Sequence, residues 1–426
     1  MIPRSCLFLF ELSALLVVGG LFFLQAQFTQ ERYEKHLTSR QLTKTCDVNS
    51  SIPVSSRGFA RVCCDIFPTV FGHHPNVPME AGVVSDPTYF TKRAIKSGDV
   101  VYVVIPDFPK FVEIFAKLER TVRITLVTGC EDVGAPWEIF HPNRGNYHHP
   151  INMLSLWPTG QLMTMREFLG DERLLRWYTQ NYDLVGNNSF ISSDMDVVAD
   201  KGMIEKVFPL PIGLDLHTLA EKDHSLSAEG IADSLCRQRK DIEDALSRSS
   251  PFLERKLSVY AKFDCKFPSS LMIVRTMTRG AICKLLESHD QNITSARNSD
   301  NQLIFSPPKE GRMSLRDAKI FFWRNVARVQ FALAPPGVGV DTHRAWEILN
   351  LHTVPIVMSS PLDKLYKMFP VIIVKDWSAV FEEGSLHKYQ SQIIARFGKD
   401  PFSKKVDDML RADYWIQMIR NGSTVA

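Results

Sequence analysis

Residues 331–360, "FALAPPGVGVDTHRAWEILNLHTVPIVMSS", place a polar, glycine-rich loop between apolar runs. The run at 329–335 predicts a buried strand, residues 341–351 predict a helix, and 353–359 predict a second strand. A strand, a helix and a strand within about thirty residues form a βαβ unit. Such a unit implies a parallel sheet that is buried on both faces, so this stretch predicts an α/β fold.

The first half of the chain carries the same signal. The apolar run "DVVYVVIP" at 99–106 predicts a strand, "FVEIFAKLER" has apolar residues at helical spacing, and "VRITLVTG" at 122–129 predicts the next strand. A further strand is expected within 202–216, and others at 257–263 and 371–377. Two βαβ-based halves are therefore expected.

The segment that joins these halves is charged and rich in serine. We expect an N-terminal Rossmann-like domain at 59–225, an interdomain segment at 226–260 and a C-terminal Rossmann-like domain at 261–426. In open parallel sheets ligands bind at the carboxyl ends of the strands, so the binding cleft is expected between the two domains.

The N-terminal sequence is typical of a membrane anchor. Residues 6–24 are almost all apolar and follow Arg4, and their length just spans a bilayer. Residues 1–27 are therefore expected to be a cytoplasmic tail and signal anchor, and 28–58 a polar stem. The alternative is a cleaved signal peptide, for which Ala26 is a poor cleavage position because Leu24 lies at −3. Both interpretations place the rest of the chain in the lumen.

Two further features agree with a luminal location. Four N-glycosylation sequons occur, at Asn49, Asn187, Asn292 and Asn421. Seven of the eight cysteines lie beyond the apolar run, and in an oxidising compartment they predict two or three disulfides.

The composition is that of a folded protein without a nucleic-acid partner. The chain has 426 residues, 45% of them hydrophobic, and 50 Lys and Arg against 47 Asp and Glu give a net charge of +3. There is no basic excess for binding nucleic acid, so an anionic ligand must be bound locally. The sequence does not set the oligomeric state, and an oligomer is compatible with it.

The loop at 335–342 has the character of an anion site. Gly337 and Gly339 let the backbone approach a ligand closely, and the following helix presents free N–H groups that favour a diphosphate. The loop lacks the lysine of a P-loop, and Thr342 stands where a dinucleotide fingerprint has its third glycine. An ATPase or an NAD-dependent enzyme is therefore disfavoured.

Arg344 and Glu347 project from one face of the helix after this loop, because they lie three residues apart. An arginine can bridge phosphate oxygens, and a carboxylate can accept hydrogen bonds from both hydroxyls of a ribose. One helix face thus offers the groups that a nucleotide-sugar requires. The alternative is an ordinary surface ion pair one turn apart.

The stretch at 335–377 resembles the signature of exostosin-like glycosyltransferases. In these proteins Ser/Thr, Arg and Glu precede a strand that begins with a hydrophobic residue and proline, and Thr342, Arg344, Glu347 and Val354-Pro355-Ile356 match that order. The usual Gly or Cys before the strand is replaced here by His352-Thr353. "LVTGCEDVGAP", "WYTQN" and "LPIGLDLHTL" are also similar to segments of this family.

This resemblance implies a GT-B fold, with a nucleotide-sugar held by the C-terminal domain and the acceptor by the N-terminal domain. It also implies inverting transfer without an essential metal or other cofactor. A single-pass type II membrane protein of the Golgi, using a UDP-sugar and a glycan or glycoprotein acceptor, is expected. The alternative is a catalytically inactive luminal module that keeps the fold to bind a glycan or a partner.

An inverting transferase needs a general base for the acceptor hydroxyl. Glu131 and Asp132 follow a predicted strand at its carboxyl end, so either is a candidate. Asp107, and Asp215 together with His217, are rivals, and each of these carboxylates has the alternative role of capping a helix or stabilising a loop. Asp194 and Asp196 form the one Asp-x-Asp, which we expect to be a loop rather than a metal site.

Overall fold

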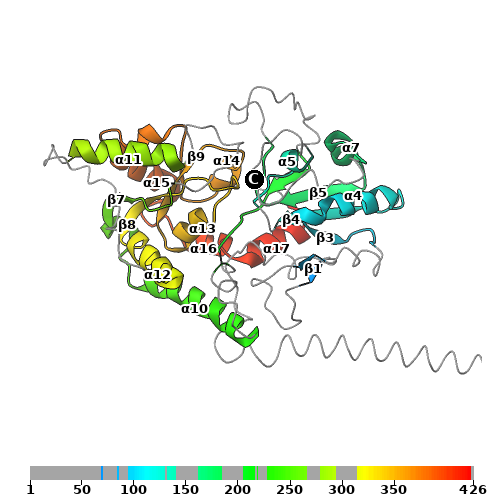
Figure 1. Cartoon of the computed structure of the whole chain (residues 1–426), viewed down its shortest axis with the longest axis horizontal. Helices are drawn as coiled ribbons and strands as arrows, with labels where there is room; N and C mark the ends of the chain where they lie inside the picture. The colour runs from blue at the N-terminus through cyan, green and yellow to red at the C-terminus, as the bar shows by residue number, and fades with distance from the viewer. Residues whose placement is uncertain are drawn as a thin grey trace, which may run out of the picture.

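The computed structural model describes residues 69–70, 84–85, 95–129, 132–140, 162–184, 205–215, 218, 228–265, 279–293 and 314–423. These residues form an α/β fold with two separate four-stranded parallel sheets (Figure 1). A short antiparallel pair, β1 (Thr69–Val70) with β2 (Val84–Ser85), belongs to neither sheet.

The first sheet holds its strands in chain order: β3 (Val100–Val104), β4 (Ile124–Gly129), β5 (Leu174–Thr179) and β6 (Val207–Pro209). Every residue of β3 and β4 is buried, as a parallel sheet covered on both faces requires. The strands expected at 99–106 and 122–129 are confirmed, and so is their parallel pairing. No strand was predicted where β5 lies.

Helices cover this sheet with aromatic side chains. The 3-10 turn η2 (Ile105–Asp107) leads into α4 (Phe108–Lys117), and α5 (Trp137–Phe140) and α7 (Met165–Gly170) follow β4. Phe108 stacks on Trp177 of β5 with ring centroids 5.1 Å apart, and Phe140 and Phe168 pack edge-on around this pair. A capping box fixes the start of α7, in which Thr164 and Glu167 exchange hydrogen bonds.

The second sheet is also parallel and in chain order: β7 (Lys256–Tyr260), β8 (Val329–Leu333), β9 (Val354–Met358) and β10 (Ile372–Val374). Strand β7 lies inside the segment 226–260 that was expected to connect the domains. The rest of that segment includes helix α10 (Ala228–Ser247), which packs against α12 (Leu315–Val326).

The remaining elements of this half are mostly helical. They are η4 (Phe252–Glu254), α11 (Arg279–Ile293), α13 (His343–Asn350), α14 (Asp363–Tyr366), η6 (Trp377–Val380), α15 (Ser385–Phe397), α16 (Lys404–Met409) and α17 (Ala412–Arg420). A disulfide joins Cys265, just beyond β7, to Cys283 on α11. The strand, helix and strand predicted around 331–360 are confirmed as β8, α13 and β9.

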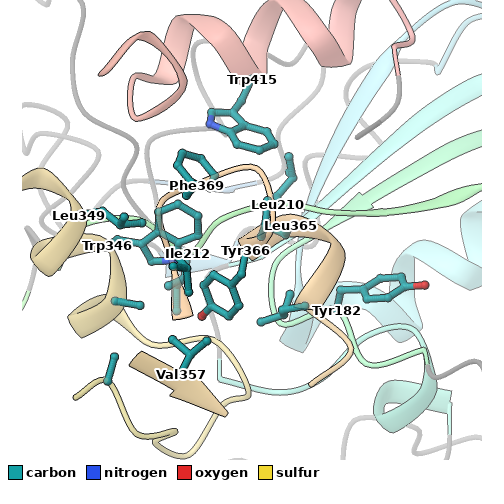
Figure 2. Close-up of a cluster of buried hydrophobic side chains, with 14 of the residues drawn as sticks. Tyr182, Leu210, Ile212, Trp346, Leu349, Val357, Leu365, Tyr366, Phe369 and Trp415 are labelled. Carbon is teal, nitrogen blue, oxygen red and sulfur yellow. The ribbon is translucent and has the colours of Figure 1, made fainter. Parts of the chain in front are cut away.

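The two halves share one hydrophobic core. Leu210 and Ile212, which follow β6, lie among Trp346, Tyr366 and Trp415 from the second half (Figure 2). Beyond the end of α17, the carbonyl of Ser423 accepts a 2.6 Å hydrogen bond from the hydroxyl of Tyr178 on β5. The C-terminal segment therefore ties the second half of the chain to the first sheet.

Several expected features fall outside the described residues: the apolar run 6–24, Glu131, His217, Asp194, Asp196, Asn49 and Asn187. Within the described part of the chain, no helix has the length and apolar character to cross a membrane. Of the remaining sequons, Asn421 is exposed at the end of α17 and Asn292 lies in the last turn of α11.

Candidate functional site

The glycine-rich loop runs from the carboxyl end of β8 to helix α13. Thr342 caps the helix, because its hydroxyl accepts a hydrogen bond from the N–H of Arg344 at 3.4 Å. A Cβ at Gly339 would lie 2.6 Å from Oδ1 of Asn181, which follows β5 of the first sheet. The absence of a side chain at Gly339 thus lets the loop backbone pack closely against Asn181 in the first half of the protein.

Asp341 anchors this loop from within the core. Its carboxylate accepts hydrogen bonds from the N–H of Ile212 at 2.8 Å and from the side chains of Trp346 and Tyr366. Its own N–H donates to Oδ1 of Asn181 at 2.9 Å. Burial raises the pKa of Asp341, whereas these donors favour the ionised form. The loop is therefore held rigidly against residues of both sheets.

Arg344 points from α13 into a half-buried position beside aromatic rings. Its guanidinium donates to the carbonyl of Lys262 and lies 4.8 Å from the ring centre of Phe322. Its surroundings in the described chain include no carboxylate at ion-pair distance, and burial lowers the pKa of Arg344. A desolvated cation of this kind is a candidate for binding an anion.

A second arginine, which sequence reasoning missed, lies near the first. Arg279 is the first residue of α11, and its Nε donates to the carbonyl of Pro336 in the glycine-rich loop at 3.0 Å. Burial lowers the pKa of Arg279 to about 10, and the positive charge of Arg344 acts in the same direction. The two like charges are thus close enough to repel one another, while Asp264 and Asp132 oppose that effect.

Glu347 is buried, with 5% of its surface exposed, and it does not form the surface ion pair with Arg344 that was the alternative expectation. Its Oε1 accepts from Nζ of Lys319 on α12 at 2.9 Å. The same ammonium donates to Oδ2 of Asp215 at 3.0 Å. Burial alone lowers the pKa of Lys319, but the two carboxylates outweigh it and raise the pKa above its ordinary value.

A small pocket opens at the carboxyl ends of β8 and β9. Its cavity volume is about 10 Å³, room for about one water molecule, and it is lined by residues that include Pro336, Thr342, Met358, Ser360 and Tyr366. The pocket begins directly beside the cap of α13, so it adjoins the loop that carries the predicted anion site.

The proposed bases have different surroundings. Asp132 is half-buried in the loop after β4, and its charge acts on Arg279 of the opposite half. Asp107 is buried at the start of α4. Asp215 has both carboxylate oxygens occupied, by Lys319 and by the N–H of Thr218. Asp132 therefore stays a candidate base, while Asp215 is held as part of a charge cluster.

A pair of buried carboxylates, also missed in the sequence, lies on helix α5 and on the segment after β5. Asp183 accepts hydrogen bonds from the N–H groups of Trp137 and Glu138, and Oε2 of Glu138 accepts from the N–H of Gly134 at 2.6 Å. Burial raises the pKa of Glu138 to about 8, and the negative charge of Asp183 adds to the rise. Burial likewise raises the pKa of Asp183 to about 7.

No group of three or more His, Cys, Asp or Glu side chains placed to hold a metal ion occurs in the described ranges. No protein-family model matches the chain, and no curated protein matches it.

Proposed function

We propose that this chain is an inverting glycosyltransferase that moves a sugar from a UDP-sugar to a hydroxyl of a glycan or glycoprotein acceptor. The observation that carries the proposal is the pair of guanidinium groups, Arg279 and Arg344, beside the loop at the carboxyl end of β8. Each guanidinium is a planar group of donors that can bind phosphate oxygens through two parallel hydrogen bonds. Two such groups beside one loop fit a ligand with two adjacent phosphates, such as a nucleoside diphosphate.

The donor would lie along the loop and helix α13. Arg344 and Arg279 contact the diphosphate, the positive end of the α13 dipole adds to its binding, and Glu347 accepts hydrogen bonds from the ribose hydroxyls. Thr342 fixes the start of the helix, and Gly337 leaves room for the ligand beside the backbone. The fold we propose is GT-B, in which two parallel-sheet domains face one another across a cleft.

The transfer requires a base on the side of the first sheet. The acceptor oxygen attacks the anomeric carbon as its proton passes to the carboxylate of Asp132 or Glu131. The bond from that carbon to the diphosphate oxygen breaks, and its electron pair leaves with the UDP. Attack from the face opposite the leaving group inverts the anomeric configuration. The growing charge on the diphosphate is stabilised by the two arginines, so no metal ion or other cofactor is required.

The donor assignment is tested by ligand binding. A panel of nucleotide-sugars and UDP is added to the full chain, and the midpoint of thermal unfolding is measured, since a ligand of the native state raises stability by mass action. We expect UDP-sugars to raise the midpoint and activity to persist in excess chelator. Loss of activity in chelator with recovery on adding Mn²⁺ would contradict metal independence. Binding of glycan without nucleotide would favour the inactive binding module.

The cellular location we propose is the Golgi membrane, with residues 6–24 as a signal anchor and the rest in the lumen. The disulfide Cys265–Cys283 supports an oxidising compartment. Expressed with a C-terminal tag, the protein should carry N-glycans and stay in the membrane fraction after a carbonate wash. Recovery as a soluble protein without glycans would contradict this topology.

A further inference from the structure

The position of the Glu347 carboxylate, which we propose binds ribose, depends on residues outside helix α13. Glu347 has 7% of its side chain exposed, and Asp215 has 12%. Two negative charges at such low exposure are unfavourable without a partner. Lys319 lies between them, with its Nζ 2.9 Å from Glu347 and 3.0 Å from Asp215.

The lysine reaches this position from a third element. It projects from α12, where 17% of its side chain is exposed and its Nζ lies 6.0 Å from the ring centre of Trp323 on the same helix. Both carboxylates keep the ammonium charged. The three groups together carry one net negative charge, and the ammonium occupies Oε1 of Glu347 specifically.

This arrangement links the two halves of the chain. Asp215 follows the stretch after β6, in which the N–H of Ile212 binds Asp341 at 2.8 Å and the carbonyl of Gly213 meets Nδ1 of His343 at 2.8 Å. Asp215 thus holds the ammonium of Lys319 from the first half of the chain, and Lys319 in turn orients the Glu347 carboxylate. With Oε1 held, Oε2 remains for a ligand.

We infer that Lys319 is a positioning residue that fixes Glu347 for the ribose hydroxyls and so makes the nucleotide site select ribonucleotides over deoxyribonucleotides. The inference rests on the proposed function, because it names the group that sets the sugar preference of the same site. A fixed carboxylate loses little conformational freedom when it binds, whereas a mobile one must be ordered by the ligand.

The test compares the affinities of UDP and 2′-deoxy-UDP for the full chain by calorimetry. We expect the wild type to prefer UDP by at least about tenfold, the range for a hydrogen bond to a charged group. Glu347→Gln should reduce this preference strongly and serves as the reference. Lys319→Met should reduce it by weakening UDP alone, whereas a purely structural role would weaken both ligands equally.

Two further variants test the inference if Lys319→Met fails to fold. Lys319→Met removes the cation between two buried carboxylates, so the double variant Asp215→Asn with Lys319→Met is made to restore the net charge of the cluster. Lys319→Arg keeps the charge and changes the geometry. We expect the UDP preference to fall at least threefold in both.

The possible results distinguish a failure of the inference about Lys319 from a failure of the proposed function. A UDP preference that stays at the wild-type value in both folded variants, while Glu347→Gln loses it, overturns the role of Lys319 and leaves the proposed function intact. An unchanged preference in Glu347→Gln overturns the ribose assignment and the inference with it. A wild-type chain that binds neither nucleotide overturns the proposed function as well.

Discussion

At the scale of single residues, the site is defined by charges that the fold has removed from water. Arg344 and Glu347 were expected on one helix face, and they do lie on α13, but each has its own environment. Glu347 is paired with Lys319, whereas Arg344 contacts a carbonyl and aromatic rings. Among the residues that the structure describes, no carboxylate lies at ion-pair distance from Arg344, although the charge of Glu347 favours its charged form, and a guanidinium suits a phosphate.

Arg344→Ala should therefore mainly lower turnover. Negative charge grows on the leaving diphosphate, so Arg344 matters more in the transition state than in the ground state. We expect a loss of about a hundredfold in kcat, or about 3 kcal/mol, with a smaller change in KM. Arg396→Ala is a matched control, because Arg396 also donates to backbone carbonyls and lies over a phenylalanine ring, far along the chain. Wild-type kinetics in folded Arg344→Ala would contradict the assignment.

Glu138 should make stability depend on pH. Its pKa is raised by burial to about 8, so the native state holds a proton that the unfolded state releases near pH 4.5. This contribution to stability is complete below pH 4.5 and is lost as the pH rises through 8. We expect the free energy of unfolding to fall by a few kcal/mol between pH 5 and about 8.5.

The measurement is urea unfolding of the wild type and of Glu138→Gln across this pH range. Glutamine stays neutral and can still accept from Gly134, so the fall should be smaller in the variant by the contribution of Glu138, while Asp183, whose pKa burial raises to about 7, keeps its own contribution. Glu172→Gln changes an exposed carboxylate and should leave the pH dependence unaltered. Equal pH dependence in wild type and Glu138→Gln would show that Glu138 titrates normally.

At the scale of elements, the disulfide and helix α11 determine where Arg279 lies. Cys283 is on the second turn of α11, and its bond to Cys265 ties that helix to the segment after β7. Arg279 begins the same helix and contacts the loop at Pro336. The covalent link therefore restrains one of the two arginines of the site.

The double variant Cys265→Ser with Cys283→Ser should weaken both stability and nucleotide binding. A bond that closes a loop with a sequence separation of 18 is worth about 3 kcal/mol through the unfolded state. We expect a lower thermal midpoint and a several-fold loss in UDP affinity, measured by calorimetry at a temperature where the variant is folded. Lower stability with unchanged affinity would show that α11 keeps Arg279 in place without the bond.

The secondary structure around the site could be predicted because it depends on local pattern. The apolar runs of β3, β4, β8 and β9 are continuous, and α13 follows a capping threonine. Strand β5 was missed because Leu174–Thr179 carries Arg176 and has an exposed Leu175 in its first half. Its last three residues are buried because β5 is an inner strand between β4 and β6 and because Phe108, Phe140 and Phe168 cover Trp177.

At the scale of the whole molecule, the glycine-rich loop is packed between the two halves. Asn181 adopts a positive φ of 49° after β5, and its side chain contacts Gly339 and accepts from the N–H of Asp341. The position of this loop thus depends on the relative placement of the two sheets.

Gly339→Ala should destabilise the protein by about 1–3 kcal/mol, because its methyl group would overlap Oδ1 of Asn181. Asn181→Gly removes that side chain and tolerates the positive φ, although it also costs the hydrogen bond to Asp341. In the Asn181→Gly background, Gly339→Ala should cost much less. A double-mutant cycle by urea unfolding measures this coupling, and additive effects would contradict the contact.

The sequence by itself determined the two parallel-sheet units, the loop after β8 and the helix that carries Arg344 and Glu347, since each rests on residues within one helical turn or one strand. Only the tertiary structure decided which charges meet: Lys319 with Glu347 and Asp215, Arg279 with Arg344, and Asn181 with Gly339. Most of these partners lie far apart in the chain, as far as 158 positions for Asn181 and Gly339 (339 minus 181). The periodicity of apolar residues predicts which face of a helix or strand a residue occupies. Contacts between residues far apart in the chain form only when separate elements pack together.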